Sequence, residues 1–298
     1  METQLGGRSE VMTRNQVRRP AALIGAAAVA AVALVLPPWL VPEHARSFAA
    51  PVSSAPSVAA DATAMDHPAC KVVQSLDRLD HPLARISRHL ESERAIKIVA
   101  IGSSSTAGAG ASSPEASYPN QLQTVLTDHF LWSDITVVNR GVNGEEAPDM
   151  LARFDAEVIA EKPDLVIWQT GTNSVLRDRP LDPKATVLHQ GVERLKAIHA
   201  DVILLDPQYA PKVIAKADAE TMVAQIAATA KEENVDVFRR FALMRRWYQY
   251  DHLPFDAFVS PDGLHMNDWS YSCLAKWLGA AIVEAATRPA ATASRPLR

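Results

Sequence analysis

KIVAIGSSSTAGAG, residues 97–110, passes from a β-branched apolar run directly into a loop of small residues. The run at 97–101 predicts a buried central strand, and the loop at 102–110 predicts a place where the backbone comes close to another group. In an open α/β sheet, ligands bind just beyond the carboxyl ends of the strands. The serines of this loop are therefore candidate nucleophiles, although a loop of this kind is more often only a tight turn between strand and helix.

Beyond this stretch, short apolar runs alternate with longer segments whose apolar residues recur at helical spacing. The pattern predicts strands at 97–101, 135–139, 165–169, 202–205 and 235–238, and helices at 118–130, 146–161, 184–199, 217–233 and 271–287. Helical spacing within 70–93 predicts a short helical lead-in. Such alternation indicates βαβ units, so we expect an α/β fold: a three-layer α/β/α sandwich around a parallel five-stranded sheet.

The N-terminal part of the chain has the composition of an export segment. Four arginines precede an uncharged apolar segment at 20–42, which is about long enough to span a bilayer. Pro37 and Pro38 would break a helix there, but the best cleavage triplet lies well past the apolar run, so a cleaved signal peptide and an uncleaved anchor both stay open. Either one predicts an exported protein, periplasmic or anchored to the outer face of the cytoplasmic membrane.

This composition also divides the chain. We expect a signal peptide or signal anchor at 1–42, an Ala/Ser/Pro-rich linker at 43–69, a folded domain at 70–290 and a tail at 291–298.

Charge and cysteine usage narrow the function classes. The net charge is −4 and the sequence pI is about 6.1, which gives no basic footprint for nucleic acid. The two cysteines, Cys70 and Cys273, form no zinc-type spacing, and no HExxH motif is present. We therefore expect no nucleic-acid partner, no metal and no cofactor.

Chemistry-bearing residues follow the predicted strands. Ser104 follows the first strand, Gly144 lies in the loop after the second, and Asn173 follows the third. Asp262 and His265 precede the last helix, three residues apart, so that their side chains share one face of a turn. A serine nucleophile needs a histidine base, which a carboxylate orients.

The same loops supply donors for a tetrahedral oxyanion. The backbone N–H groups of Ser104 and Gly144 and the side-chain amide of Asn173 fill that role if they converge. Each residue also has a structural interpretation, as a turn glycine, a helix cap or a packed histidine. Five signals on one predicted sheet edge favour an acyl-transfer site.

These blocks resemble those of the SGNH hydrolases, the GDSL esterase and lipase family. Gly102-Ser103-Ser104 resembles the family's Gly-Asp-Ser, Gly171-Thr172-Asn173 its Gly-x-Asn, and Asp262-Gly263-Leu264-His265 its Asp-x-x-His. The oxyanion glycine corresponds best to Gly144, with Gly141 as a less favoured register. Two positions depart from the family: Ser103 replaces its usual aspartate, which puts the bracing of the first loop in question, and Ser174 follows Asn173 where aspartate is common.

The resemblance implies a flavodoxin-like fold and a serine esterase with Ser104, His265 and Asp262 as its triad. We expect a small acyl ester or an acylated glycan as substrate, with short acyl groups favoured by the absence of a long hydrophobic insertion. An acyltransferase using the same acyl-enzyme and a non-catalytic carbohydrate-binding domain are the alternatives. Oligomeric state is not predicted.

Cys70 and Cys273 are either a disulfide or two buried thiols. Export to an oxidising compartment favours the disulfide, which would tie the lead-in to the closing helix.

Overall fold

The structure is a computed structural model that describes Cys70 and residues 78–288. The predicted signal or anchor at 1–42, the linker at 43–69 and the tail at 291–298 lie outside the described residues. Among the described helices, none has the length and apolar character needed to cross a bilayer.

A parallel five-stranded sheet lies at the centre of the domain, as the sequence predicts. Its strands, in spatial order, are β2 (Ile135–Gly141), β1 (Ile96–Gly102), β3 (Leu165–Gln169), β4 (Asp201–Leu205) and β5 (Asp236–Phe238). Ile98 is in register with Val137 on one side and with Leu165 on the other, so β1 lies inside the sheet. Strand residues 98–101 are at most 1% exposed, as expected of a strand covered on both faces.

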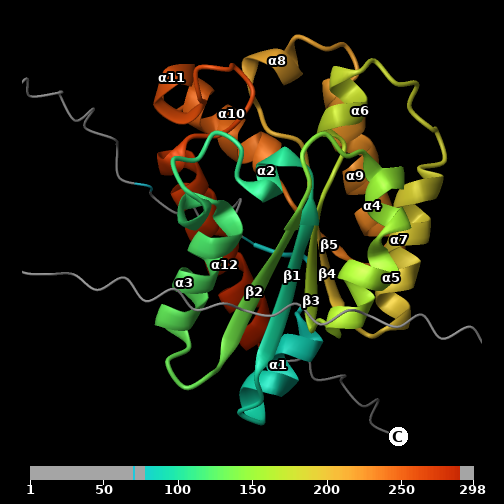
Figure 1. Ribbon diagram of the computed structural model, residues 1–298, viewed down its shortest axis with the longest axis vertical. Helices are drawn as coiled ribbons and strands as arrows, with labels where there is room; N and C mark the ends of the chain where they lie inside the picture. The colour runs from blue at the N-terminus through green and yellow to red at the C-terminus, as the bar shows by residue number, and fades with distance from the viewer. Residues whose placement is uncertain (1–69, 71–77, 289–298) are drawn as a thin grey trace, which may run out of the picture. The chain divides into compact units, whose positions relative to one another are not determined.

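Helices cover both faces of this sheet (Figure 1). One layer contains α3 (Tyr118–His129) and α12 (Asp268–Thr287), and the other contains α4 (Ala147–Ala152), α5 (Phe154–Glu157), α7 (Thr186–Ala197) and α9 (Ala219–Glu233). The remaining helices are α1 (Ala84–Glu91), α2 (Ser104–Ala107), α6 (Thr172–Leu176), α8 (Pro211–Ile214), α10 (Arg240–Gln249) and α11 (Phe255–Phe258), with 3-10 turns at Pro114–Ala116 and Ile159–Glu161. The three-layer α/β/α architecture is thus confirmed.

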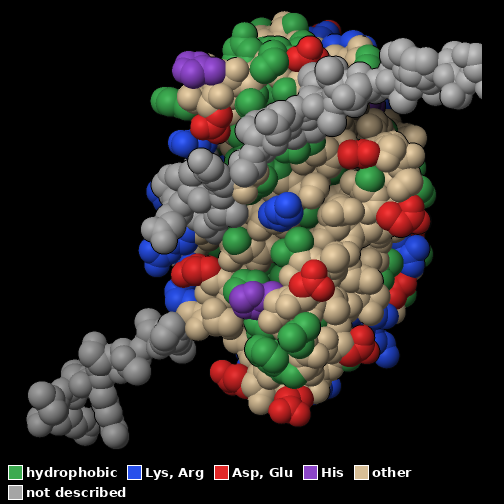
Figure 2. All heavy atoms as spheres, turned by 90° about the vertical axis from the view of Figure 1, so that its left-hand side faces the viewer, with side chains coloured by type: hydrophobic (Ala, Val, Ile, Leu, Met, Phe, Trp, Pro, Cys, Tyr) green, Lys and Arg blue, Asp and Glu red, His purple; other side chains and the backbone are tan. Residues whose placement is uncertain are grey.

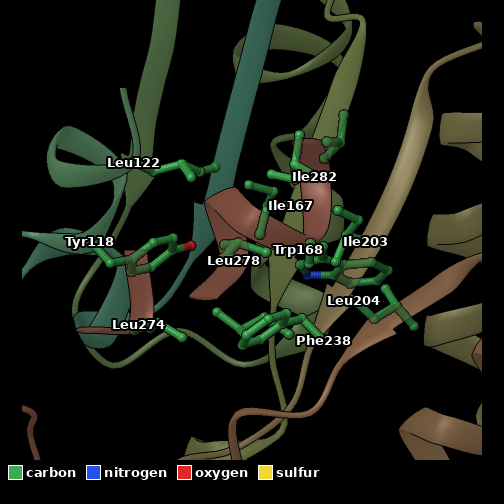
Figure 3. Close-up of a cluster of buried hydrophobic side chains, with 14 of the residues drawn as sticks. Tyr118, Leu122, Ile167, Trp168, Ile203, Leu204, Phe238, Leu274, Leu278 and Ile282 are labelled. Atoms are coloured by element: carbon green, nitrogen blue, oxygen red, sulfur yellow. The ribbon is translucent and has the colours of Figure 1, made fainter. Parts of the chain in front are cut away.

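The core forms where these layers meet the strands. Figure 3 shows Tyr118 of α3 and Leu278 of α12 directed toward side chains of the central strands. Trp168 of β3 is fully buried against the layer that contains α4 and α5. Its ring contacts the ring of Phe154 edge-on, with centroids 5.1 Å apart, and its indole N–H donates to Met150 Sδ at 3.2 Å. A Cβ on Gly191 would lie 2.3 Å from the indole, so only glycine lets α7 approach this ring.

The prediction of a single helix at 146–161 is wrong. The segment forms α4, α5 and a 3-10 turn. The division occurs at Arg153, whose φ of −105° and ψ of 7° leave the helical region. Its guanidinium donates to Arg140 O at 2.7 Å and to Glu145 Oε2 at 2.8 Å. The side chain thereby bonds the end of β2, and these contacts hold Arg153 out of a continuous helix.

Within the described residues 78–93 of the predicted lead-in, α1 covers Ala84–Glu91 and begins after Leu83. Helix α10 was not predicted at all. Its arginines interrupt the apolar spacing, yet the first of them, Arg240, is fully buried.

The face that carries α3 and α12 shows no concentration of one charge. Figure 2 shows Lys and Arg side chains interspersed with Asp and Glu over this side of the molecule. Hydrophobic side chains gather at its two ends. A basic stripe of the kind that binds nucleic acid is not visible on this face.

A disulfide joins Cys70 to Cys273 of α12, with Cα atoms 5.5 Å apart. The bond spans 203 positions and connects the start of the described chain to the closing helix. Cys273 is 1% exposed and Cys70 is half-buried, so the bond is only partly shielded from solvent.

Reduction of this bond should destabilise the domain. Because the disulfide lowers the conformational entropy of the unfolded chain, its loss should lower the free energy of unfolding by about 2–4 kcal/mol. Urea unfolding with and without reductant measures the free energy of unfolding of the wild type and of Cys70→Ser. The variant should be as stable as the reduced wild type, and reductant should not change its stability. A wild type whose unfolding is insensitive to reductant would contradict the bond.

Candidate active site

Ser104 is the first residue of α2, immediately after β1. Ser103 before it is extended, with φ −92° and ψ −150°, so the chain turns sharply from strand to helix. The first N–H groups of a helix have no acceptor within it, which leaves the N–H of Ser104 free for a ligand. The Ser104 side chain is partly exposed, whereas both neighbouring serines are buried.

The structure brings Ser104, His265 and Asp262 into one hydrogen-bonded chain. His265 Nε2 lies 2.8 Å from Ser104 Oγ, and His265 Nδ1 bonds Asp262 Oδ2 on its other side. An ionised carboxylate only accepts, so Nδ1 carries the proton and Nε2 is left to accept the serine hydroxyl. This is the geometry that a serine nucleophile and its base require.

Asp262 is held in its ionised form by local donors. Partial burial raises the pKa of its carboxyl, but hydrogen bonds from the His265 side chain and from the backbone N–H groups of His265 and Leu264 outweigh this and lower the pKa below its usual 3.8. Both N–H groups lie 2.9 Å from Oδ1. The carboxylate is therefore charged throughout the neutral range and can stabilise an imidazolium.

The loop that carries His265 is fixed by the loop after α2. Ser260 N–H donates to His265 O at 2.8 Å, closing a short antiparallel bridge between Val259 and Met266. Gly110 lies against this bridge with φ +89°, and a Cβ there would be 2.5 Å from Met266 O and 2.8 Å from His265 Cβ. A side chain at this position would displace the histidine.

The three predicted oxyanion donors come from the segments that follow three strands: Ser104 begins α2, Gly144 lies in the turn after β2, and Asn173 is the second residue of α6. Gly144 has φ +80°, and Arg177 Nη2 donates to its carbonyl at 2.7 Å. Asn173 Nδ2 donates to Glu145 O at 2.8 Å, which ties the amide to the Gly144 loop. A side-chain amide has two N–H groups, so one remains for an oxyanion.

The structure separates the two glycine registers. Gly141 N–H already donates to Asn139 Oδ1 at 2.9 Å, and a Cβ on Gly141 would lie 2.0 Å from Ala107 N. The absence of a side chain at Gly141 thus allows α2 to pack closely against the end of β2. Within the described part of the chain, the N–H of Gly144 has no such acceptor, which favours Gly144 as the donor.

Gln169, which the sequence analysis did not single out, bonds the residues on either side of Ser104 and Ser105. Its Oε1 accepts from Ser103 N at 2.9 Å, from Ser103 Oγ at 3.0 Å and from Thr106 Oγ1 at 3.3 Å. Gln169 is the last residue of β3, and its position at the carboxyl end of a strand is the signal that could have identified it.

Glu146 is a second residue that sequence reasoning missed. It accepts from Ser174 Oγ at 2.9 Å and from Arg177 Nη1 at 2.7 Å, so it links the loops that carry Gly144 and Asn173. Partial burial raises the pKa of Glu146, but the bonds from Arg177 and Ser174 outweigh it, and the net pKa is lowered. Ser174, at the position where the family has aspartate, thus takes part in this link.

A hollow of about 260 Å³ opens beside these loops, lined by Thr170, Ser174, Leu181 and Met222 among others. Neither Ser104 nor His265 lines it. Among the described residues, no group of three or more His, Cys, Asp or Glu is placed to hold a metal ion.

Curated proteins with similar sequences are esterases. An arylesterase of Vibrio mimicus is 28% identical over 120 residues, which cover 40% of this chain and 58% of that protein. An acetylxylan esterase of Geobacillus stearothermophilus is 36% identical over 85 residues, 25% of this chain and 39% of that protein. The matches therefore span less than two thirds of either relative.

Solved structures share the fold. A two-domain esterase active on acetylated mannans superposes with a TM-score of 0.62 at 20% identity, covering 74% of this chain and 58% of that one. At this identity the likeness concerns the fold alone.

A family model extends over nearly the whole described domain. The model, described as the Non-GDSL lipase-like family, matches residues 69–288, which include every residue of the candidate site. The resemblance to GDSL-type esterases is thereby confirmed at the level of the family, and Ser103 at the aspartate position agrees with the family's description. The chain belongs to the Non-GDSL lipase-like family.

Proposed function

We propose that this chain is a serine esterase that hydrolyses short acyl esters through an acyl-enzyme on Ser104. The observation that carries the proposal is the chain of hydrogen bonds from Ser104 Oγ through His265 to Asp262. A serine hydroxyl is unreactive without such a base, and the partly exposed Ser104 side chain gives a substrate access to it.

Acylation follows from this geometry. His265 Nε2 takes the hydroxyl proton as Ser104 Oγ attacks the ester carbonyl, and the resulting imidazolium is stabilised by Asp262. Negative charge then develops on the carbonyl oxygen. The N–H groups of Ser104 and Gly144 and the free N–H of Asn173 stabilise that charge.

Acylation ends when the tetrahedral intermediate collapses: the bond to the alcohol breaks, His265 gives its proton to the leaving alcohol, and the acyl group stays on Ser104 Oγ. In deacylation the same Nε2 accepts a proton from water, which attacks the acyl carbonyl. Collapse of the second tetrahedral intermediate releases the acid, and the proton returns to Ser104. Every proton transfer uses one histidine nitrogen.

We propose acetylated or similarly short-chain acylated glycans as the substrate class. Relatives include an acetylxylan esterase, and aromatic side chains lie next to the His265 loop. Tyr248 stacks on Phe255 at 4.4 Å, and Phe255 stacks on Tyr209 at 6.0 Å. Lys212, three residues after Tyr209, donates its N–H to Gly263 O at 3.0 Å, so the chain that carries Tyr209 is bonded to the loop that carries His265. Tyr248 is 42% exposed, so the stack offers a ring surface of the kind that lines ligand sites.

We further propose that the domain works outside the cytoplasmic membrane. The arginine-flanked apolar segment at 20–42 supports export. The disulfide between Cys70 and Cys273 supports an oxidising compartment.

Ser104→Ala tests the proposal. Loss of the nucleophile should lower kcat on p-nitrophenyl acetate by on the order of 10⁴- to 10⁶-fold. Ser112→Ala is the matched control, because the exposed Ser112 uses only its backbone N–H, bonded to Asp268, and should keep full activity. A Ser104→Ala protein that retained most of its activity would exclude this mechanism.

Tyr248→Ala tests the substrate class. Removing the exposed ring should raise KM for an acetylated xylo-oligosaccharide about 5- to 20-fold, because binding contacts of about 1–2 kcal/mol are lost, and leave kcat/KM for p-nitrophenyl acetate unchanged. Tyr250→Ala, with a ring that is 72% exposed, is the control and should change neither. Equal effects of Tyr248→Ala on both substrates would argue against a glycan site.

A further inference from the structure

Gln208, in the loop after β4, connects three separate segments through one buried side chain. Its Oε1 accepts from Thr172 Oγ1 and from Arg240 Nη2, each at 3.0 Å. Its Nε2 donates to Leu264 O at 3.3 Å. Gln208 is 1% exposed, so these bonds form away from bulk water, where each polar group needs its partner.

Two of the segments carry the opposite halves of the candidate site. Thr172 immediately precedes Asn173, the oxyanion donor, and Leu264 immediately precedes His265, the base. The Gln208 side chain therefore bonds both the start of α6, next to Asn173, and the loop next to His265. The two halves lie on segments about 90 residues apart in sequence, and each must be placed relative to Ser104.

Arg240 determines which way this amide points. The guanidinium is fully buried, and its Nε donates to Asp206 O at 2.9 Å while its Nη2 faces Gln208. A guanidinium has only donors, so the oxygen of Gln208 must face it and the NH₂ group must face Leu264 O. The buried cation thus fixes the orientation that Leu264 requires.

We propose that Gln208 is a positioning residue that couples the start of α6, which carries Asn173, to the loop that carries His265. It does not touch Ser104, and it acts through Leu264 and Thr172. The position needs an acceptor at one end and a donor at the other, which a glutamine amide supplies and a carboxylate does not. This inference rests on the proposed esterase function.

Gln208→Glu isolates the donor. The substitution keeps the length of the side chain and the acceptors for Arg240 and Thr172, but sets an oxygen against Leu264 O. We expect kcat on p-nitrophenyl acetate to fall about 10- to 100-fold with KM changed less than about twofold, since small misplacement of a catalytic group costs rate. Gln121→Glu is the matched control: Gln121 Nε2 also donates to a backbone carbonyl, that of Glu115, at 2.9 Å, and its loss should leave kcat unchanged.

A double-mutant cycle separates positioning from general stability. In a His265→Ala background there is no imidazole to place, so Gln208→Glu should lower the residual rate by less than about twofold. A merely structural role would lower the residual rate by the same factor in both backgrounds and would lower the Tm. Gln208→Met lacks both polar ends and also loses the bond from Thr172. Its effect should therefore be smaller in His265→Ala than in the wild type but not abolished, and it serves if Gln208→Glu folds poorly.

The outcomes are distinguishable. Full activity of a folded Gln208→Glu protein, or additive losses in the cycle, would overturn the positioning role. If instead the wild type shows no hydrolysis beyond Ser104→Ala, the proposed function itself fails.

Discussion

The 2.8 Å contact between Ser104 Oγ and His265 Nε2 joins positions 161 residues apart in the chain. Ser104 follows the first described strand, and His265 precedes the last helix. Everything between them, four strands with their crossovers, must be in place before the two atoms can meet. The site therefore exists only in the folded sheet, and no local segment contains it.

The sheet alone does not position these atoms, because the loops at its edge are held by buried polar side chains. Gln169 accepts three hydrogen bonds from the nucleophile loop, and Gln208 bonds both the Asn173 and the His265 loops. The buried oxygens of these two amides need hydrogen-bond donors, so they stabilise the loop arrangements that supply those donors. A separate, steric requirement excludes side chains at Gly110 and Gly141, because a Cβ there would clash with the neighbouring segment.

Much of this arrangement could be predicted from sequence. Apolar runs such as 97–101 and 165–169 predict the strands, and their alternation with helical spacing predicts the parallel sheet. The site residues could be proposed because each follows a strand or precedes the last helix, where a parallel sheet gathers them on one edge.

The rest depends on contacts between distant segments. Arg153 interrupts a helix because its guanidinium bonds the end of β2, and Arg240 lies buried in α10 because Asp206 and Gln208 accept its hydrogen bonds. The spacing of apolar residues around Arg153 and Arg240 gives no information about these distant acceptors. The position of Gln169 at the carboxyl end of a strand marks it as a residue near the site, but its bonds to Ser103 come from the fold and not from local spacing.

The central claim is that His265 activates Ser104, and covalent labelling by a fluorophosphonate followed by peptide mass spectrometry tests it most directly. We expect a single phosphonyl adduct on the peptide that contains Ser104, formed at least about 10³-fold more slowly in His265→Ala, because the base is then missing. An adduct on another residue, or a labelling rate that His265→Ala leaves unchanged, would contradict the claim.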